Sequence, residues 1–475
     1  MLLKHILRDR WGFDGYVTSD CGAVGDLVTS YHLSPDYAHA AALALEAGVD
    51  TSCGSAFLYL GDAVRGGFLS ESLIDAALRH LYAVQFRLGM FDPAERVPYS
   101  SITIADNDTA QHAAVALEAA RKSIVLLKNT GVLPLPETLT SIAVIGPNAD
   151  SVPVLLGNYN GTPSAPVTVL QGIRAKVGAS TQVRYARGCD YVEPSSDSNE
   201  ATNAIALAKA ADVIIFVGGI SAEFEGEEGD DALRGNLDGF SNGDRTKIEL
   251  PRVQEDLLQA LFATGKPVVY VQMSGSAIAS VWEAKYLPAI VQAWYPGEAG
   301  GTAVADVLFG DYNPAGRLPV TFYASTADLP PFTDYTTKER TYRYFRGTPL
   351  YPFGHGLSYT QFTYSNLRVT HGAPGMIYLR CTVKNTGERA GDEVVQVYVR
   401  LTEAPLGNPL RQLCAFDRVP LASGESRTLS FAIPAERFSR WSKEHTRFEV
   451  FAGTYEFEVG ASSADIRLSS RIYIA

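Results

Sequence analysis

The sequence predicts a mixed fold, with α/β units over roughly its first 330 residues and an all-β domain at its end. Short apolar strands alternate with helical segments in the first part. In the last hundred or so residues, apolar and polar side chains alternate at a period of two. With 475 residues, 46% of them hydrophobic, the chain can form about three domains that each bury a core.

Residues 1–95 contain two successive βα units. We expect strands at residues 15–19 and 49–52, with a helix after each. Ser34 should cap the first helix, with Pro35 at its first position, and the second helix should run over residues 74–88. The two strands should pair in parallel, because a helix connects them.

Residues 96–330 continue the alternation as a doubly wound α/β sandwich. The strands there are continuous apolar runs, which is typical of strands buried on both faces. Strands are predicted at residues 125–129, 141–147, 213–217, 266–271 and 289–294, and helices at 112–124, 201–211, 252–264 and 300–309.

Residues 331–360 are rich in proline, glycine and tyrosine and are predicted to be an ordered linker. Residues 361–475 are predicted to form a β-sandwich. In one strand Ile377, Leu379, Cys381 and Val383 should face one way and the residues between them the other. Further alternating runs include Val395, Val397 and Val399, then Phe448 and Val450, then Tyr455, Phe457 and Val459.

Charge and cysteine content exclude several classes of protein. Lys and Arg total 40 against 52 Asp and Glu, a net charge of −12, so neither a nucleic acid nor an anionic membrane is an expected partner. No apolar run reaches the length of a transmembrane helix. The five cysteines include no CxxC pair, so we expect no structural zinc site.

Asp20 is the first candidate for chemistry, because it stands at the carboxyl end of a predicted parallel strand. Functional side chains of α/β folds gather at that end. The alternative is a turn or capping aspartate, since Gly22 follows closely.

The second candidate is the acidic loop after the strand at residues 213–217, which holds Glu223, Glu225, Glu227 and Glu228. Glycoside hydrolysis needs two carboxyl groups. One attacks the anomeric carbon or activates a water, and the other protonates the leaving oxygen. Asp20 and one of these glutamates have the required chemistry. The alternative is a solvated acidic loop.

Several aromatic side chains are candidates for stacking on sugar rings, or for packing in the core and linker. They are Trp294, Tyr295, Tyr342, Tyr344 and Tyr351. No dinucleotide or phosphate-binding glycine motif is present, and Ser274 and Ser276 lack the GxSxG pattern of a nucleophilic serine.

The segment Gly12-Phe13-Asp14-Gly15-Tyr16-Val17-Thr18-Ser19-Asp20-Cys21 resembles the nucleophile motif of glycoside hydrolase family 3. Further stretches similar to that family recur to the end of the chain, at residues 123–129, 133–135, 143–149, 156–161, 294–297, 310–319 and 351–359. The resemblance covers essentially the whole chain.

The resemblance implies a (β/α)₈-type barrel, an α/β sandwich and a fibronectin-III-like domain. It maps the family nucleophile onto Asp20 and the acid/base onto Glu225, with Glu223 and Glu227 as alternatives. It implies a retaining double displacement, with the two carboxyl groups about 5–5.5 Å apart on the sugar and no metal or organic cofactor.

Cys21 suggests the β-xylosidase branch, in which a cysteine tends to follow the nucleophile. It is a candidate substrate contact, and it is expected to lie close enough to Cys53 for a disulfide. The implied substrate is a β-1,4-xyloside. The alternatives are a β-glucoside, an α-L-arabinofuranoside, or a non-catalytic fragment.

A complete (β/α)₈ barrel takes about 250 residues, whereas residues 1–95 hold at most its last two strands and helices. We therefore expect this chain to be the C-terminal part of a longer enzyme, inactive without the rest of the barrel, with apolar barrel surface exposed. The resemblance implies a periplasmic or secreted enzyme, although residues 1–9 do not form a signal peptide.

Overall fold

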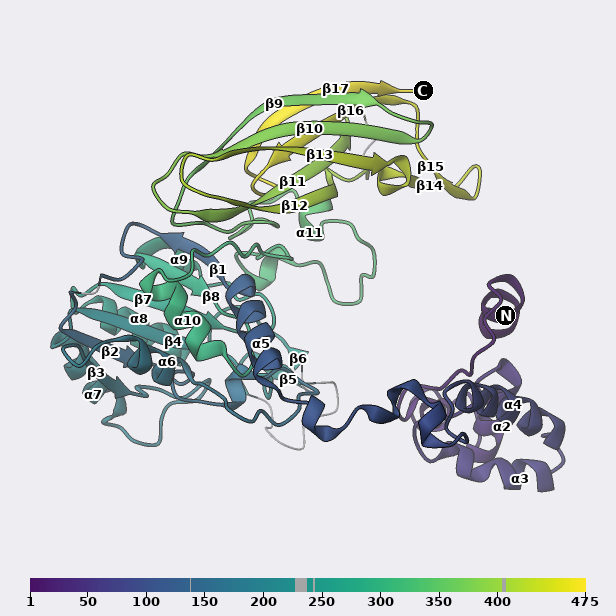
Figure 1. Cartoon of the computed structure of the whole chain (residues 1–475). Helices are drawn as coiled ribbons and strands as arrows, with labels where there is room; N and C mark the ends of the chain where they lie inside the picture. The colour runs from purple at the N-terminus through teal and green to yellow at the C-terminus, as the bar shows by residue number, and fades with distance from the viewer. Residues whose placement is uncertain (137, 227–236, 242–243, 404–406) are drawn as a thin grey trace. The chain divides into compact units, whose positions relative to one another are not determined.

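The computed structural model describes residues 1–136, 138–226, 237–241, 244–403 and 407–475. The chain divides into two compact units, Met1–Asn107 and Asp108–Ala475 (Figure 1). Each unit is described by itself. The finer domain boundaries at residues 95, 330 and 360 stay predictions.

Helices dominate the first unit. A π-helical segment, Leu2–Arg10, is followed by α1 (Ala23–Thr29), α2 (Tyr37–Ala47), α3 (Leu60–Arg65) and α4 (Glu71–Arg87). The strands predicted at residues 15–19 and 49–52 are reduced to one parallel bridge, Thr18 to Thr51. The prediction of full strands was wrong because a lone parallel pair, without further neighbours, gains too few ladder hydrogen bonds.

The predicted start of the first long helix was also wrong by two residues. Asp36, not Ser34, caps α2, and its carboxylate accepts the His39 N–H at 2.9 Å. The Ser34 hydroxyl instead donates to the Asp36 carbonyl at 3.1 Å. Both residue types are good caps, so sequence preference alone did not separate them.

A mostly parallel sheet forms the centre of the α/β part of the second unit. Its strands, in spatial order, are β1 (Val125–Asn129), β8 (Ala289–Gln292), β7 (Val268–Met273), β4 (Val213–Gly219), β2 (Ser141–Ile145) and β3 (Gln182–Ala186). Only the β1–β8 pairing is antiparallel. A short hairpin, β5 (Phe240–Ser241) with β6 (Asp244–Arg245), lies outside this sheet.

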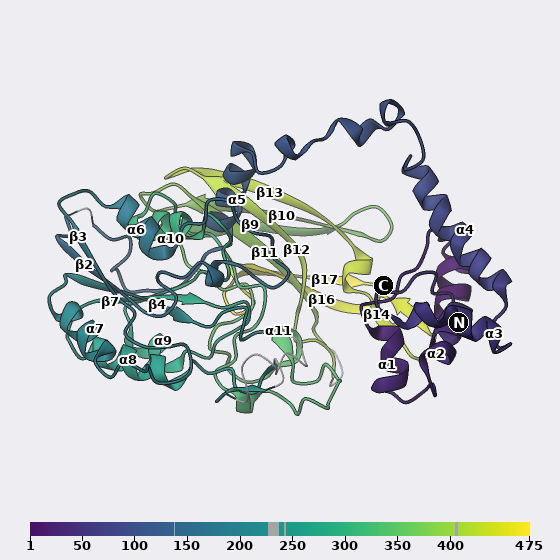
Figure 2. The same ribbon diagram turned by 90° about the horizontal axis from the view of Figure 1, so that it is seen from below.

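Helices cover both faces of this sheet (Figure 2). One face carries α5 (Ala110–Ser123), α6 (Val169–Lys176) and α10 (Gly300–Phe309), and the other carries α7 (Glu200–Lys209), α8 (Arg252–Phe262) and α9 (Val281–Tyr286). Successive strand residues alternate between the two cores, so Ile142 and Val144 pack on one side and Ala143 and Ile145 on the other. This double burial explains the uninterrupted apolar runs in the sequence.

The last part of the chain is a β-sandwich. One sheet has the order β13 (Ser426–Pro434), β10 (Met376–Asn385), β9 (Phe362–His371), and the other the order β12 (Gln412–Leu421), β11 (Gly391–Leu401), β16 (Gly453–Gly460), β17 (Ile466–Ile474). Ile377, Leu379, Cys381 and Val383 share one face, as predicted, and that face packs in the core. A strand forms at Phe448, but this side chain is 69% exposed, on the hairpin of β14 (Arg440–Ser442) and β15 (Arg447–Glu449).

The outer face of β11 is also buried, against the linker segment. The Gln396 side chain donates to the Gly354 carbonyl at 3.1 Å and accepts a hydrogen bond from the Tyr398 hydroxyl at 2.6 Å. A buried ion pair, Arg317 to Glu393 at 3.0 Å, joins the α/β part to the same strand. The linker segment includes the short helix α11 (Thr341–Tyr344). It is tied to the sandwich at Gly354 and through the Tyr342 hydroxyl, which accepts the Leu413 N–H, whereas Phe332 and Tyr335 are exposed.

Candidate active site

The carboxyl end of β4 turns sharply into the acidic loop. Gly219 has a φ of +128°, and a Cβ at this position would lie 2.1 Å from the Met273 carbonyl oxygen. The Gln254 side chain holds both sides of the turn, because it accepts the Gly219 N–H at 2.8 Å and donates to the Gly219 carbonyl at 2.6 Å. The positive φ and the close approach of the Met273 carbonyl both require glycine here. The turn directs the next residues out of the sheet.

Glu225, in that loop, is held by its main chain and by its carboxylate. Asn158 donates to its carbonyl oxygen at 2.7 Å. The carboxylate accepts the Gly275 N–H at 2.8 Å and the Ser276 N–H at 3.0 Å. It also accepts hydrogen bonds from the Ser276 and Tyr295 hydroxyls. We call this set the Glu225 cradle: Asn158, Arg245, Gly275, Ser276 and Tyr295.

Arg245 belongs to the cradle through Ser276. Its guanidinium donates to the Ser276 hydroxyl oxygen at 2.7 Å and to the Ala277 carbonyl at 2.8 Å. Burial lowers the pKa of Arg245, and the charge of Glu225 opposes that shift. Since Ser276 accepts from Arg245, its own proton is left to point at Glu225.

Tyr295 is a half-buried donor of the cradle. Burial raises the pKa of its hydroxyl, and the neighbouring Glu225 carboxylate raises it further. The hydroxyl therefore keeps its proton at any physiological pH and acts only as a donor to Glu225.

The other candidate glutamates differ from Glu225 in what the structure shows. Glu223 is exposed, and its charge contributes to raising the pKa of Tyr191. Glu227 lies outside the described residues. Glu225 is therefore the candidate whose carboxylate accepts hydrogen bonds from backbone N–H groups, those of Gly275 and Ser276 just after β7.

Asp20 lies in the first unit, directly after the Thr18–Thr51 bridge. Its side chain is exposed, and Oδ1 accepts the Cys21 N–H at 2.8 Å. Cys21 and Cys53 form a disulfide, with their Cα atoms 4.3 Å apart. The Ser19 N–H donates to the Thr51 carbonyl at 3.0 Å, so hydrogen bonds and a covalent bond tie the two strand ends beside Asp20.

Asp50 organises the other end of this pair of segments. Its buried carboxylate accepts hydrogen bonds from the Arg8 guanidinium at 2.5 Å and from the Val17 N–H at 2.7 Å. Its second oxygen contacts the His80 ring at 2.8 Å. This network fixes the segment that leads to Asp20.

Sequence reasoning missed most of these supporting residues. Asn158 lies inside a segment that resembled the family, and Ser276 was considered only as a nucleophile. Tyr295 was a candidate for stacking, whereas in the structure its hydroxyl bonds Glu225. Arg245 and Asp50 gave no signal, because their partners are distant in sequence.

Within the described ranges, no group of three or more His, Cys, Asp or Glu side chains is placed to hold a metal ion. In the same residues, no helix combines the length and hydropathy that crossing a membrane requires.

Three family descriptions match consecutive parts of the chain. Residues 1–84 match the glycosyl hydrolase family 3 N-terminal domain, residues 124–359 its C-terminal domain, and residues 393–463 a fibronectin type III-like domain. The three matches follow one another along the chain in the order N-terminal domain, C-terminal domain, fibronectin type III-like domain.

Curated relatives align over nearly the whole chain. A xylan 1,4-β-xylosidase of Xylanibacter ruminicola is 35% identical over 98% of this chain and 70% of its own length. A periplasmic β-glucosidase of Salmonella typhimurium is 35% identical over 99% of this chain and 64% of its own length. The chain thus spans about two thirds of the relatives it matches.

Solved structures agree with the sequence matches. A family 3 exo-β-xylosidase in complex with a xylobiose aziridine activity-based probe superposes with a TM-score of 0.86, at 32% identity, over 100% of this chain and 63% of that one. A β-glucosidase from Erythrobacter marinus gives a TM-score of 0.85 at 33% identity, over 100% of this chain and 65% of that one. The chain belongs to glycoside hydrolase family 3.

Proposed function

We propose that the protein containing this chain is a retaining, exo-acting β-glycosidase that removes terminal sugars from β-1,4-xylosides. The observation that carries the proposal is the Glu225 cradle, which fixes one carboxylate at the carboxyl end of a parallel strand. Asp20 supplies a second, exposed carboxylate beside a disulfide. The relatives named as xylosidases support this choice of substrate.

In the first step, a carboxylate oxygen of Asp20 bonds to the anomeric carbon while the glycosidic C–O bond breaks. The electron pair stays on the leaving oxygen, which takes the proton of Glu225. The products of this step are the free aglycone and a glycosyl ester on Asp20.

In the second step, a water oxygen attacks the anomeric carbon and the ester bond to Asp20 breaks. Glu225, now a carboxylate, takes a proton from that water. Two displacements at one carbon retain its configuration.

The cradle has a defined role in this cycle. After Glu225 has given up its proton, its carboxylate is charged, and the Gly275 and Ser276 N–H groups and the Tyr295 hydroxyl donate to that charge. Such preorganised donors stabilise charge without reorganisation at the moment of reaction. No step requires a metal or an organic cofactor.

A β-glucoside is the second candidate substrate, because β-glucosidases of similar identity and TM-score are among the relatives. An α-L-arabinofuranoside is the third. A panel of aryl glycosides on the complete gene product separates them. We expect the highest kcat/KM on the β-D-xyloside, and a higher value on the glucoside would replace that assignment. The absence of turnover on every glycoside would favour a non-catalytic fragment.

We also propose that the protein is exported to the periplasm or the medium. The Cys21–Cys53 disulfide supports this, since such bonds persist in oxidising compartments. One relative carries the word periplasmic in its name.

The acid/base assignment is tested by E225A on two substrates. The leaving group of an activated aryl β-xyloside departs with little protonation, whereas the leaving sugar of xylobiose must be protonated. We therefore expect the loss of kcat/KM on xylobiose to be larger by roughly 100-fold or more. The variant E223A is the matched control and should keep both activities. Equal losses on the two substrates in E225A, or the selective loss in E223A, would reject Glu225.

A further inference from the structure

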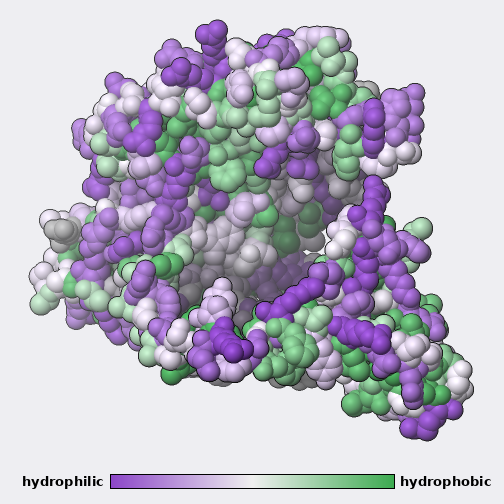
Figure 3. Space-filling view, turned by 45° about the vertical axis from the view of Figure 1, so that its right-hand side comes forward, coloured by the Kyte–Doolittle hydropathy of each residue, from purple (hydrophilic) through white to green (hydrophobic). Residues whose placement is uncertain are grey.

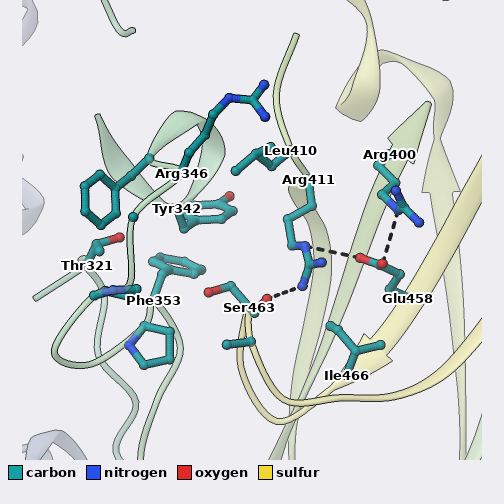
Figure 4. Close-up of a pocket in the computed structure, with 15 residues that line it drawn as sticks. Thr321, Tyr342, Arg346, Phe353, Arg400, Leu410, Arg411, Glu458, Ser463 and Ile466 are labelled. Atoms are coloured by element: carbon teal, nitrogen blue, oxygen red, sulfur yellow. Dashed lines mark hydrogen bonds and ion pairs between the residues drawn. The ribbon is translucent and has the colours of Figure 1, made fainter. Parts of the chain in front are cut away.

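A pocket of about 660 Å³ lies between the linker segment and the β-sandwich (Figure 4). It shares no residue with the Glu225 cradle. Its aromatic and charged lining residues are Tyr342, Phe345, Arg346, Phe353, Arg400, Arg411 and Glu458, and Thr321 and Ser463 also contribute. Its size is that of a typical small-ligand site.

One side of the pocket is aromatic. The rings of Tyr342 and Phe353 stack with centroids 4.2 Å apart and planes within 16°. The Tyr342 hydroxyl accepts the Leu413 N–H at 3.0 Å, which ties this wall to β12 and leaves the hydroxyl proton free to donate. Rigid rings of this kind suit the C–H groups of a sugar ring.

The facing side is charged (Figure 4). Glu458 forms ion pairs with the Nε atoms of Arg400 and Arg411, both at 3.3 Å. Arg411 also donates to the Ser463 carbonyl.

Positive charge exceeds negative charge in this pocket. Arg346 is exposed at its edge, so three guanidinium groups and one carboxylate line it. Counting Glu456, which pairs with Arg400 and Arg471, still leaves four guanidinium groups against two carboxylates. In a chain of net charge −12, this local excess favours an anionic ligand.

One buried polar atom in these walls has no hydrogen-bond or ion-pair partner within the described part of the chain. It is Thr321 Oγ1, and Thr321 as a residue is only 7% exposed. Buried polar atoms are normally paired, so this hydroxyl is a candidate partner for a ligand hydroxyl group.

We propose that this pocket binds a saccharide that carries a carboxylate, that is, a uronic acid residue. The rings of Tyr342 and Phe353 receive its apolar C–H groups. Arg346 and Arg411 receive the carboxylate, and Thr321 bonds one of its hydroxyls. The proposal does not rest on the hydrolytic function, and its test measures binding alone.

The test is calorimetric titration of the full chain with methyl β-D-glucuronide, methyl β-D-glucoside and sodium sulfate. We expect the glucuronide to bind at least tenfold more tightly than the glucoside, and more weakly at high salt because salt screens the ion pair. Equal binding of the two glycosides, no binding, or equally tight binding of sulfate would overturn the proposal.

Two variants locate the ligand. R346Q changes an exposed side chain and should weaken glucuronide binding severalfold, while R380Q, an exposed arginine on β10, should not. T321V removes a buried unpaired hydroxyl, so it should weaken binding without lowering the melting temperature. Unchanged affinity in both R346Q and T321V would place any binding elsewhere and contradict the assignment.

Discussion

At the scale of single residues, the most informative contact is the one between Tyr295 and Glu225. The hydroxyl is half-buried, keeps its proton and donates to the carboxylate. A hydrogen bond to a charged group contributes about 1.5–3 kcal/mol. If Glu225 is the acid/base, this hydrogen bond stabilises the ionised form of its carboxylate.

The variant Y295F should therefore lower kcat/KM of the complete enzyme by roughly 10- to 100-fold, and should shift the pH profile of kcat/KM. Y270F is the matched control, because the buried Tyr270 hydroxyl has no hydrogen-bond partner among the described residues. Wild-type kinetics in Y295F, or an equal loss in Y270F, would contradict a positioning role for Tyr295.

Glu283 is a buried carboxyl group that the mechanism does not use. It lies on α9, is 1% exposed, and burial raises its pKa to about 7. Between its ordinary value of 4.5 and about 7, the folded state holds a proton that the unfolded state releases. Its contribution to stability is therefore largest at low pH and decreases as pH rises through this window.

From pH 5 to pH 8 this single group should lower the free energy of unfolding by up to about 3 kcal/mol. E283Q cannot titrate, so its stability should fall less than that of the wild type over the same range. Urea denaturation of both proteins at the two pH values measures the difference. Parallel pH dependences would show that Glu283 has an ordinary pKa.

At the scale of elements, the end of β4 determines where Glu225 can lie. Gly219 lets β4 and β7 approach closely, and the chain then turns into the loop. A side chain at this position meets backbone rather than a movable side chain, so the strands themselves would have to shift.

G219A should destabilise the protein by at least about 2 kcal/mol and should also reduce turnover. Gly178 is the control position, because a Cβ there meets nothing closer than 3.9 Å and its φ is ordinary. G178A should be neutral in chemical denaturation. Equal stability of the two variants would show that the β4 turn tolerates a side chain.

Strands were predicted correctly where both faces of the strand are buried. Predictions failed where strand formation or burial depends on neighbouring elements. The apolar runs of β2, β4 and β7 were correct because both of their faces are covered by helices. The strands predicted at residues 15–19 and 49–52 have the right residues but only one bridge between them. Phe448 has the right period, but its hairpin lies outside the sandwich core.

At the scale of the whole molecule, composition and pattern predicted the α/β and all-β parts, and the motifs predicted the family. The candidate site was only partly predictable. Asp20 follows a predicted strand and Glu225 lies in the loop after an apolar strand, which are local signals, whereas the cradle joins Asn158, Arg245, Ser276 and Tyr295 from four separate segments. Such long-range contacts depend on folding, and no local pattern encodes them.

The molecular surface carries many hydrophilic side chains. Hydrophilic and hydrophobic residues are interspersed over the face seen in Figure 3. Within the first unit several large apolar side chains are exposed, including Trp11 at 71%, Leu58 at 82% and Phe86 at 65%. Exposure of this kind was predicted from the sequence for residues 1–95.

The central claim is that Asp20 is the nucleophile of a retaining glycosidase. The most direct test is to incubate the complete enzyme with a 2-deoxy-2-fluoro-β-xylosyl fluoride, which forms the covalent intermediate but hydrolyses it slowly. Peptide mapping by mass spectrometry should find the fluoroxylosyl group on Asp20, and D20A should take up none. A label on another carboxylate, or turnover of substrate with inverted configuration and no label, would contradict the account.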